Sequence, residues 1–277
     1  MGIKIFKIAK KIVKSFHDQA IKLKWSEKII NDNDAEYNEL KEYGVLKFKI
    51  NFENFANYIN INYVKNILSN QSNKTPHGFF DNRGNDRNAL VNHYLNLDDQ
   101  QIKNFILNDS IMNILYKIYN KKVYLRNDPL LQVLNTKEKL TNGNFHTDRF
   151  MQFSLMLLLE DLSENETHME YCERSHNRSK FDFIIHKNFE ECQNHVKKNN
   201  FKIRKLIGKK GDAFLFNTIG IHRANYINGS KRSIFHLNFT NGHNLYSFKN
   251  QPIQATEQIF LRTDKKLKFT DSGWKFF

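Results

Sequence analysis

Beyond about residue 121 the chain consists of short apolar runs separated by turn-forming residues, and this pattern limits the fold more than any other feature. The runs begin with KVYLRNDPLLQVLN (122–135), continue through NFHTDRFMQFSLMLLLED (144–161) and end with KRSIFHLNFTNG (231–242). One polar, helix-like insertion at 177–200 interrupts them. Many short strands separated by turns predict a β-sandwich or a jelly roll.

The N-terminal third differs from this pattern and is predicted to be largely helical. Residues 1–25 form a basic amphipathic segment, with isoleucines at helical spacing and lysines on the remaining face. Helical character is also predicted for residues 26–42, 52–70 and 98–120, a strand for YGVLKFKI (43–50) and an irregular loop for 71–88. We therefore expect a mainly β protein, with a single domain over 26–277 and a β-core at about 121–242.

Composition limits the environment of the protein. No apolar run approaches the roughly 20 residues that a membrane-spanning helix needs. Only two cysteines occur, Cys172 and Cys192, so no disulfide framework is implied and both thiols are expected to be inert. A reducing, cytoplasmic location is therefore predicted.

The formal net charge of +14 indicates an anionic partner or, alternatively, only a lysine-rich soluble surface. The basic helix predicted at 1–25 could lie on an anionic membrane, which would place the protein at the inner membrane face, or it could dock on the domain that follows. Nucleic acid is not expected as a partner, because the basic residues are dispersed and no recognised binding motif accompanies them.

His146 and Asp148 lie two residues apart at the start of a predicted strand. Because residues i and i+2 of a strand point to the same face, the two side chains could bind one metal ion. A second pair of the same kind, His168 and Glu170, occurs nearby. The residues that follow each pair must therefore distinguish them.

The segment GDAFLFNTIGIHRANYINGSKR (211–232) supplies His222 and, ten residues later, Arg232. Two imidazoles and one carboxylate form a facial ligand set that leaves three positions open on a non-haem Fe(II) ion. A nearby arginine could bind a carboxylate through two hydrogen bonds. Arg223 is a rival for this role, but as the neighbour of His222 on a strand it would face the opposite side.

These motifs resemble those of the phytanoyl-CoA hydroxylase-like branch of the Fe(II)/2-oxoglutarate-dependent dioxygenases. The resemblance covers about 43–240 and includes YGVLKFKI, HTD, LMLLLEDLSENETHMEYCERSH, GDAFLFNTIGIH and INGSKRSIF. In place of the Pro-Gly that usually precedes the Ser-His of that family, the chain has Glu173-Arg174. The resemblance implies a double-stranded β-helix, the cupin-like form of the jelly roll.

By this resemblance His146, Asp148 and His222 would ligate Fe(II), and Arg232 would bind the distal carboxylate of 2-oxoglutarate. With dioxygen as the third reactant, the implied activity is hydroxylation of an unactivated C–H bond. Asp148 fills the ligand position that related halogenases leave vacant for chloride. The substrate is expected to be a small or a lipid- or glycan-linked molecule, and the charge of the chain favours an anionic one. A cupin-type sugar isomerase or binding protein is the alternative, and it would not need Arg232.

Four further residues have open roles. Gln132 and Asn135 precede the metal motif on a predicted strand, and could contact the keto-acid end of the cosubstrate or lie at the edge of a ladder. His236 could face the pocket or only pack, and His176 is expected to be structural, closing a turn.

Overall fold

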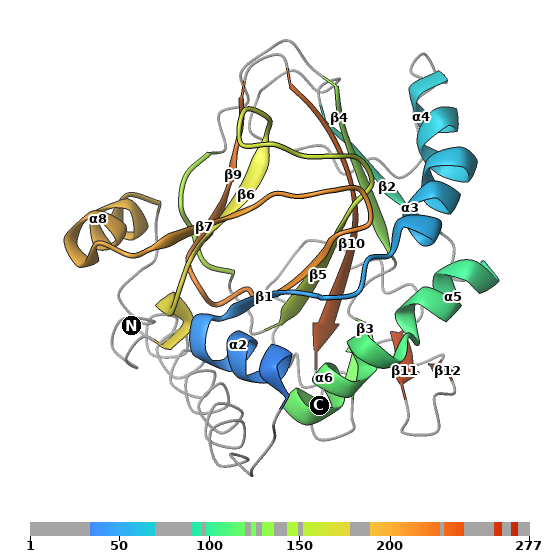
Figure 1. Ribbon diagram of the computed structural model, residues 1–277, viewed down its shortest axis with the longest axis horizontal. Coiled ribbons are helices and arrows are strands. Elements are labelled where there is room, and N and C mark those ends of the chain that lie inside the picture. Colours follow the sequence, from blue (N-terminus) through green and yellow to red (C-terminus); the bar gives the residue numbers. More distant parts are fainter. Residues whose placement is uncertain are drawn as a thin grey trace, which may run out of the picture.

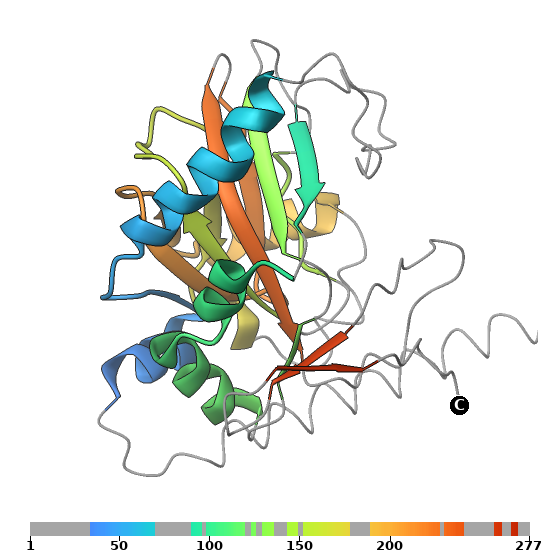
Figure 2. The ribbon, with the colours of Figure 1, turned by 90° about the vertical axis from the view of Figure 1, so that its right-hand side faces the viewer.

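Two antiparallel sheets form the centre of the protein, and helices cover the outer face of the larger one (Figures 1 and 2). The computed structural model describes residues 34–69, 90–95, 98–119, 123–125, 129–135, 143–148, 152–177, 189–227, 230–240, 258–261 and 267–270. The helix predicted at 1–25 and the loop predicted at 71–88 lie outside these residues. Within them, no helix is both long enough and apolar enough to cross a membrane.

The helical layer comes from the N-terminal part of the chain, as predicted. Its helices are α2 (Ala35–Tyr43), α3 (Glu53–Ile59) followed by a π-helical turn (Asn60–Val64), α4 (Lys65–Ser69), α5 (Gln100–Ile106) and α6 (Asp109–Tyr119). Asp34 and Asp99 begin α2 and α5 by accepting hydrogen bonds from the first free backbone N–H groups. Gly44 ends α2 with a φ of 80°, a left-handed conformation that glycine adopts without strain.

The larger sheet is nine-stranded. Its strands are β1 (Val45–Lys47), β2 (Leu90–Tyr94), β3 (Val123–Leu125), β4 (Leu130–Asn135), β5 (Phe153–Leu158), β8 (Ala213–Asn217), β10 (Lys231–Thr240), β11 (Gln258–Leu261) and β12 (Leu267–Thr270). The central order is β1-β8-β5-β10-β4-β2. The predicted strand at 43–50 is therefore β1, paired with β8.

The smaller sheet consists of β7 (Ile203–Leu206), β6 (His168–Cys172) and β9 (His222–Asn225), in that order. An isolated bridge between His146 and His222 adds residues 143–148 beside β9. Helix α8 (Phe189–Asn199), which lies beside this sheet in Figure 1, corresponds to the polar insertion predicted within the β-region.

The path of the chain between the sheets identifies a double-stranded β-helix. From β4 the chain enters the smaller sheet at 143–148, returns to the larger one in β5, and passes through β6 and β7 of the smaller sheet. It then alternates again through β8, β9 and β10. This is the jelly-roll arrangement predicted from the sequence.

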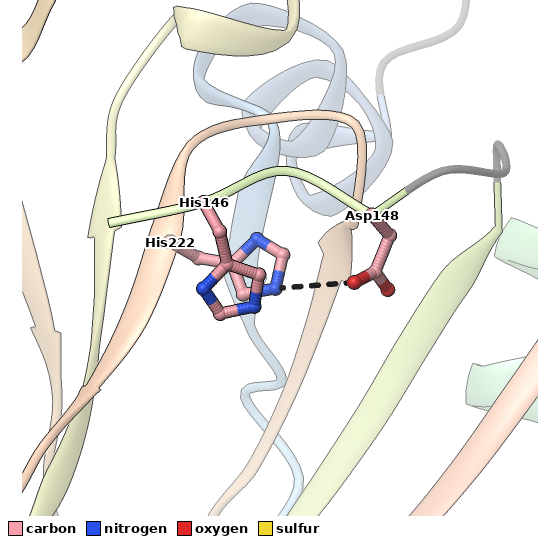
Figure 3. A group of neighbouring side chains, drawn as sticks. All are labelled: His146, Asp148 and His222. Atoms are coloured by element: carbon pink, nitrogen blue, oxygen red, sulfur yellow. Dashed lines mark ion pairs between the residues drawn. The ribbon is translucent and has the colours of Figure 1, made fainter. Parts of the chain in front are cut away.

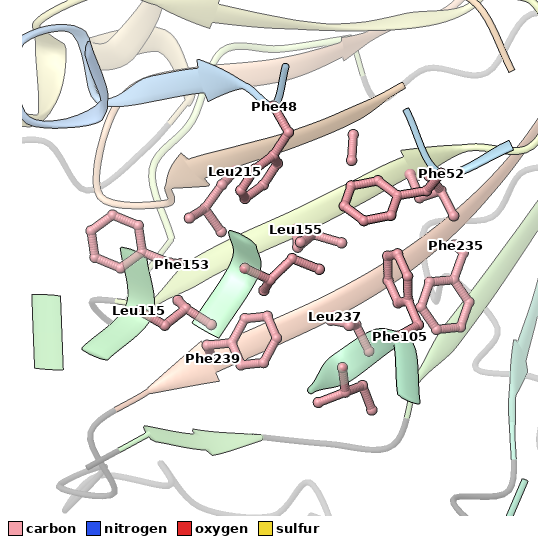
Figure 4. Close-up of a cluster of buried hydrophobic side chains, with 14 of the residues drawn as sticks. Phe48, Phe52, Phe105, Leu115, Phe153, Leu155, Leu215, Phe235, Leu237 and Phe239 are labelled. Carbon is pink, nitrogen blue, oxygen red and sulfur yellow. The ribbon is translucent and has the colours of Figure 1, made fainter. Parts of the chain in front are cut away.

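The central strands β5 and β8 are buried on both faces, which explains the unbroken apolar run FSLMLL of β5. Phe153 and Leu155 of β5 pack with Leu215 of β8 and Phe235 of β10 against the helical layer (Figure 4). The alternate residues, among them Met156 of β5, pack between the two sheets. Burying a side chain of this size contributes about 1.5–3 kcal/mol, so both faces of the sheet stabilise the fold.

The turn at Glu173-Arg174 adopts a conformation that glycine would favour. Arg174 has a φ of 64°, in the left-handed region. Its backbone N–H donates to the Tyr43 carbonyl (2.9 Å), its guanidinium lies 5.2 Å from the Tyr43 ring centroid, and it pairs with Glu42. Glu173 accepts a 2.6 Å hydrogen bond from Arg204. Contacts with α2 therefore hold a non-glycine residue in this left-handed conformation.

Candidate metal centre

His146, Asp148 and His222 converge between the two sheets (Figure 3). Two backbone hydrogen bonds of 2.9 Å join His146 and His222 as an antiparallel pair, which places their rings 4.5 Å apart, centroid to centroid. The Asp148 Oδ1 atom lies 3.9 Å from the His222 Nε2 atom. One potential ligand atom from each residue lies within 4.8 Å of the other two, and no other such group of three occurs among the described residues.

Backbone carbonyls orient both imidazoles. The His146 Nδ1 atom lies 3.0 Å from the Asn144 carbonyl oxygen, and the His222 Nδ1 atom lies 2.9 Å from that of Gly220. A carbonyl oxygen can only accept, so Nδ1 carries the hydrogen and the lone pair of each neutral ring is on Nε2. Histidine ligands in metal sites are commonly held in this way.

The Asp148 carboxylate is held by Gln152, a residue that the sequence analysis did not single out. The Gln152 side-chain amide donates to Asp148 Oδ2 (3.0 Å), and the Asp148 backbone N–H donates to the Thr218 carbonyl (2.9 Å). Gln152 is only 4% exposed. The one signal in the sequence was a polar residue immediately before an apolar strand, four positions after Asp148.

This donor set fits a divalent iron ion. Two imidazole nitrogens and one carboxylate oxygen form the facial set that leaves three coordination positions open. Small side-chain rotations would bring atoms now within 4.8 Å of one another to bonding distances of about 2.1 Å from a common ion.

Arg232 is a buried cation in the same interior. On β10, Arg232 points to the same face as Ile234, which packs between the two sheets. Phe235 points to the opposite face, towards the helical layer. Only 3% of Arg232 is exposed, and its Nε and Nη1 atoms have no hydrogen-bond partner among the described residues. Burial lowers the pKa of Arg232, with Tyr226 and Glu160 acting in the opposite direction.

A buried guanidinium with two unused donors is costly unless an anion pairs with it. Its fixed fork matches a carboxylate, so the interior can hold an acidic ligand in addition to a metal ion. The Arg232 side chain therefore fits the distal carboxylate of a keto acid on chemical grounds.

The rival arginine has other partners. Arg223 donates to Glu170 Oε2 (2.7 Å) and to the Gly143 carbonyl (3.2 Å), and its guanidinium lies 4.3 Å from the Phe145 ring centroid. Glu170 also lies 3.5 Å from His168 Nε2. The His168–Glu170 pair is therefore part of an ionic cluster with Arg223, and the described structure does not bring a third metal-binding residue to it.

The predicted residues of β4 differ in their positions. Gln132 pairs with Ile234 and shares the inward face of the sheet, whereas Asn135 pairs with Lys231 at the end of the strand. Residues three apart on a strand alternate between its faces, so the register assigns only Gln132 to the interior. The Asn135 side chain lies outside the described part of the structure.

His236 lies on the inward face of β10 and is half-buried. Burial lowers the pKa of His236 to about 4. The Asp148 carboxylate opposes this shift, whereas the Arg232 charge adds to it. His236 is thus electrostatically coupled both to the candidate metal ligands and to the buried arginine.

The remaining predicted residues lie in packed surroundings. His176 belongs to a short 3-10 turn (Ser175–Asn177), and its Nε2 atom contacts the Lys41 carbonyl at 3.0 Å. Cys172 and Cys192 are buried in one apolar cluster and form no disulfide.

Comparison with solved structures identifies the fold class of the chain. No family model and no curated protein matches the sequence. Among solved structures, EctD from S. alaskensis with bound Fe is 12% identical with a TM-score of 0.60, over 77% of this chain and 78% of that one. SnoK, a non-heme alpha ketoglutarate dependent carbocyclase from nogalamycin biosynthesis, is 14% identical with a TM-score of 0.57, over 76% and 84%. AviO1 from Streptomyces viridochromogenes Tue57 is 12% identical with a TM-score of 0.55, over 78% and 98%.

These likenesses show that the chain has the cupin-like jelly roll found in 2-oxoglutarate-dependent enzymes, which is the predicted fold class. EctD has been crystallised with Fe and also with 2-oxoglutarate and 5-hydroxyectoine. The neighbours include a carbocyclase and an epimerase, so the fold is compatible with several reactions.

Proposed function

We propose that the protein is a non-haem Fe(II)/2-oxoglutarate-dependent dioxygenase of the phytanoyl-CoA hydroxylase-like kind. It would hydroxylate an unactivated C–H bond of a small or a lipid- or glycan-linked, anionic substrate. The observation that carries the proposal is that the facial donor set and a buried arginine with unused donors share one interior.

Each side chain has a distinct task in this proposal. His146, Asp148 and His222 hold Fe(II) on one side and leave the opposite side for ligands. Arg232 binds and orients the distal carboxylate of 2-oxoglutarate. The apolar packing between the sheets limits the access of water to the reacting groups. Iron, 2-oxoglutarate and dioxygen together supply the oxidising power, with succinate and carbon dioxide as by-products.

A metal-binding cupin without oxidative chemistry is the competing function. Such a protein would have no use for a carboxylate-binding arginine in its interior. Burying that charge without a partner would cost several kcal/mol, on the order of the effective penalty for one buried ion. The Arg232 donors, which no described residue pairs, therefore favour the dioxygenase.

The test begins with anaerobic binding. Wild-type protein loaded with Fe(II) is expected to bind 2-oxoglutarate and, on exposure to air, to form succinate in an iron-dependent reaction. A panel of anionic metabolites and envelope lipids would then be screened for substrates that accelerate succinate formation. Metal binding without any affinity for 2-oxoglutarate would reject the dioxygenase and favour the cupin alternative.

The substrate class rests on charge alone. The net charge of +14 and the basic segment at 1–25 favour an anionic substrate or an anionic membrane as partner. Salt-sensitive sedimentation with vesicles that contain anionic lipid would support a membrane-associated substrate. Absence of binding at every salt concentration would direct the search to soluble anions.

A further inference from the structure

The two carboxylate oxygens of Asp148 have different surroundings. Oδ1 faces His222, 3.9 Å from its Nε2 atom, whereas Oδ2 accepts the hydrogen bond from Gln152 at 3.0 Å. An ionised carboxylate can only accept, so Gln152 must present its NH2 group to Oδ2. One oxygen thus faces His222 and the other faces Gln152.

Gln152 is fixed by its own backbone as well as by burial. The Thr218 N–H donates to the Gln152 carbonyl (3.0 Å), while the Thr218 carbonyl accepts from the Asp148 N–H (2.9 Å). The backbones of Asp148 and Gln152 are therefore both tied to one residue at the end of β8. The two backbones are therefore fixed relative to each other, and burial restricts the Gln152 side chain.

We propose that Gln152 is a positioning residue that keeps Asp148 monodentate on the metal by occupying its Oδ2 oxygen. This inference rests on the proposed function. Two imidazoles and one oxygen occupy three of six octahedral positions, whereas a bidentate carboxylate would occupy a fourth. A chelating keto acid needs two positions and dioxygen needs one. Gln152 thereby preserves the position that dioxygen requires.

The experiment compares the full-length wild type with Gln152→Met and Gln152→Asn. Methionine keeps the length of the side chain and removes the donor, and asparagine keeps the amide but withdraws it by one methylene. Ser154→Ala is the matched control, because Ser154 lies two residues along, is 1% exposed and donates to Asn238, a residue outside the ligand set.

Three quantities are measured without oxygen: the affinity for Mn(II), the affinity of the Fe(II) protein for nitric oxide with and without 2-oxoglutarate, and the melting temperature. Nitric oxide serves as a stable analogue of dioxygen and gives an EPR signal when bound. Both Gln152 variants should bind Mn(II) about 10–100-fold more weakly, the usual effect of losing such a supporting hydrogen bond. They should also lose at least tenfold in nitric oxide affinity once 2-oxoglutarate is present, and much less in its absence. Ser154→Ala should lower the melting temperature but leave both affinities within threefold of wild type.

The outcomes separate the two hypotheses. If the wild type binds metal and 2-oxoglutarate and the Gln152 variants match it in nitric oxide affinity, only the role of Gln152 is overturned. If the wild type itself fails to bind metal or 2-oxoglutarate, the proposed function fails and this inference fails with it. A loss in Ser154→Ala equal to that in the Gln152 variants would show a general packing effect and would also overturn the proposal.

Discussion

Replacing Arg232 with methionine should weaken the binding of 2-oxoglutarate and at the same time stabilise the protein without ligand. The Nε and Nη1 donors are both buried and have no hydrogen-bond partner in the part of the chain that the structure describes. A hydrogen bond to a charged group contributes about 1.5–3 kcal/mol, so losing two of them should cost about 3–6 kcal/mol of binding free energy. That corresponds to an affinity lower by about 10²–10⁴-fold.

The effect on stability has the opposite sign. Burial lowers the pKa of Arg232, which means that the folded state disfavours its charge. Replacing a buried ionic group by an apolar one of similar size is neutral or stabilises by about 1–4 kcal/mol. At about 2–4 °C per kcal/mol for a chain of this size class, the melting temperature of Arg232→Met should rise by several degrees.

Arg223→Met is the matched control, because Arg223 has partners on the other face of β9. Its loss leaves Glu170, which is 5% exposed, without its 2.7 Å ion pair. We expect a loss of about 1–3 kcal/mol in stability, reduced from the buried-pair value because Arg223 is 26% exposed. Its affinity for 2-oxoglutarate should be unchanged. Calorimetric titration of Mn(II)-loaded protein and thermal melts of the ligand-free proteins measure both quantities. The reasoning is refuted if Arg223→Met loses 2-oxoglutarate binding and Arg232→Met retains it.

Three further outcomes are expected. Each single replacement of His146, Asp148 or His222 by alanine should abolish Fe(II)-dependent turnover of 2-oxoglutarate, while the far-UV circular dichroism is retained. Double variants should lose little more activity than single ones. Near-normal coupled turnover in any single variant would contradict the assignment. The neutral form of His236 stabilises the folded state above pH 6.5, and this contribution is lost as the pH falls through about 4. The variant His236→Gln should therefore show a smaller decline in melting temperature between these two pH values. An unchanged pH profile would argue against this role of His236. Deleting residues 1–24 should leave Mn(II) affinity unchanged, because the candidate ligands all lie beyond residue 140. Salt-sensitive vesicle binding that disappears with the deletion would identify a membrane segment, whereas a lower melting temperature of the truncated protein would indicate docking.

The sequence predicted the candidate metal set because its geometry follows from local rules. The i, i+2 spacing of His146 and Asp148 needs only an extended backbone, and the structure brings both to His222. Alternation along a strand also separated Arg223 from His222, and the structure gives Arg223 its own carboxylate partner. In these positions, local periodicity determines which face a side chain occupies.

Gln152 could not be predicted in the same way. Its role depends on the turn at Thr218, which returns the chain so that Asp148 and Gln152 bond to one residue. No local pattern specifies such a contact between residues about 70 positions apart. The positions of Gln132 and Asn135, in contrast, were open to prediction. Residues three apart on a strand cannot share a face, so at most one of them could line the interior.

The arrangement of the two sheets connects the packing of the fold with its proposed chemistry. His146 and His222 are attached to the smaller sheet, whereas Arg232 belongs to the larger one. A dicarboxylate that bridges the metal and Arg232 would therefore link the sheets, across the apolar cluster that holds Met156 and Tyr171 between them. Because such a ligand binds only when both sheets are in place, its binding free energy adds to the stability of the folded state. Burial disfavours the charge of Arg232, so a carboxylate bound to Arg232 would offset a cost that the packing between the sheets imposes.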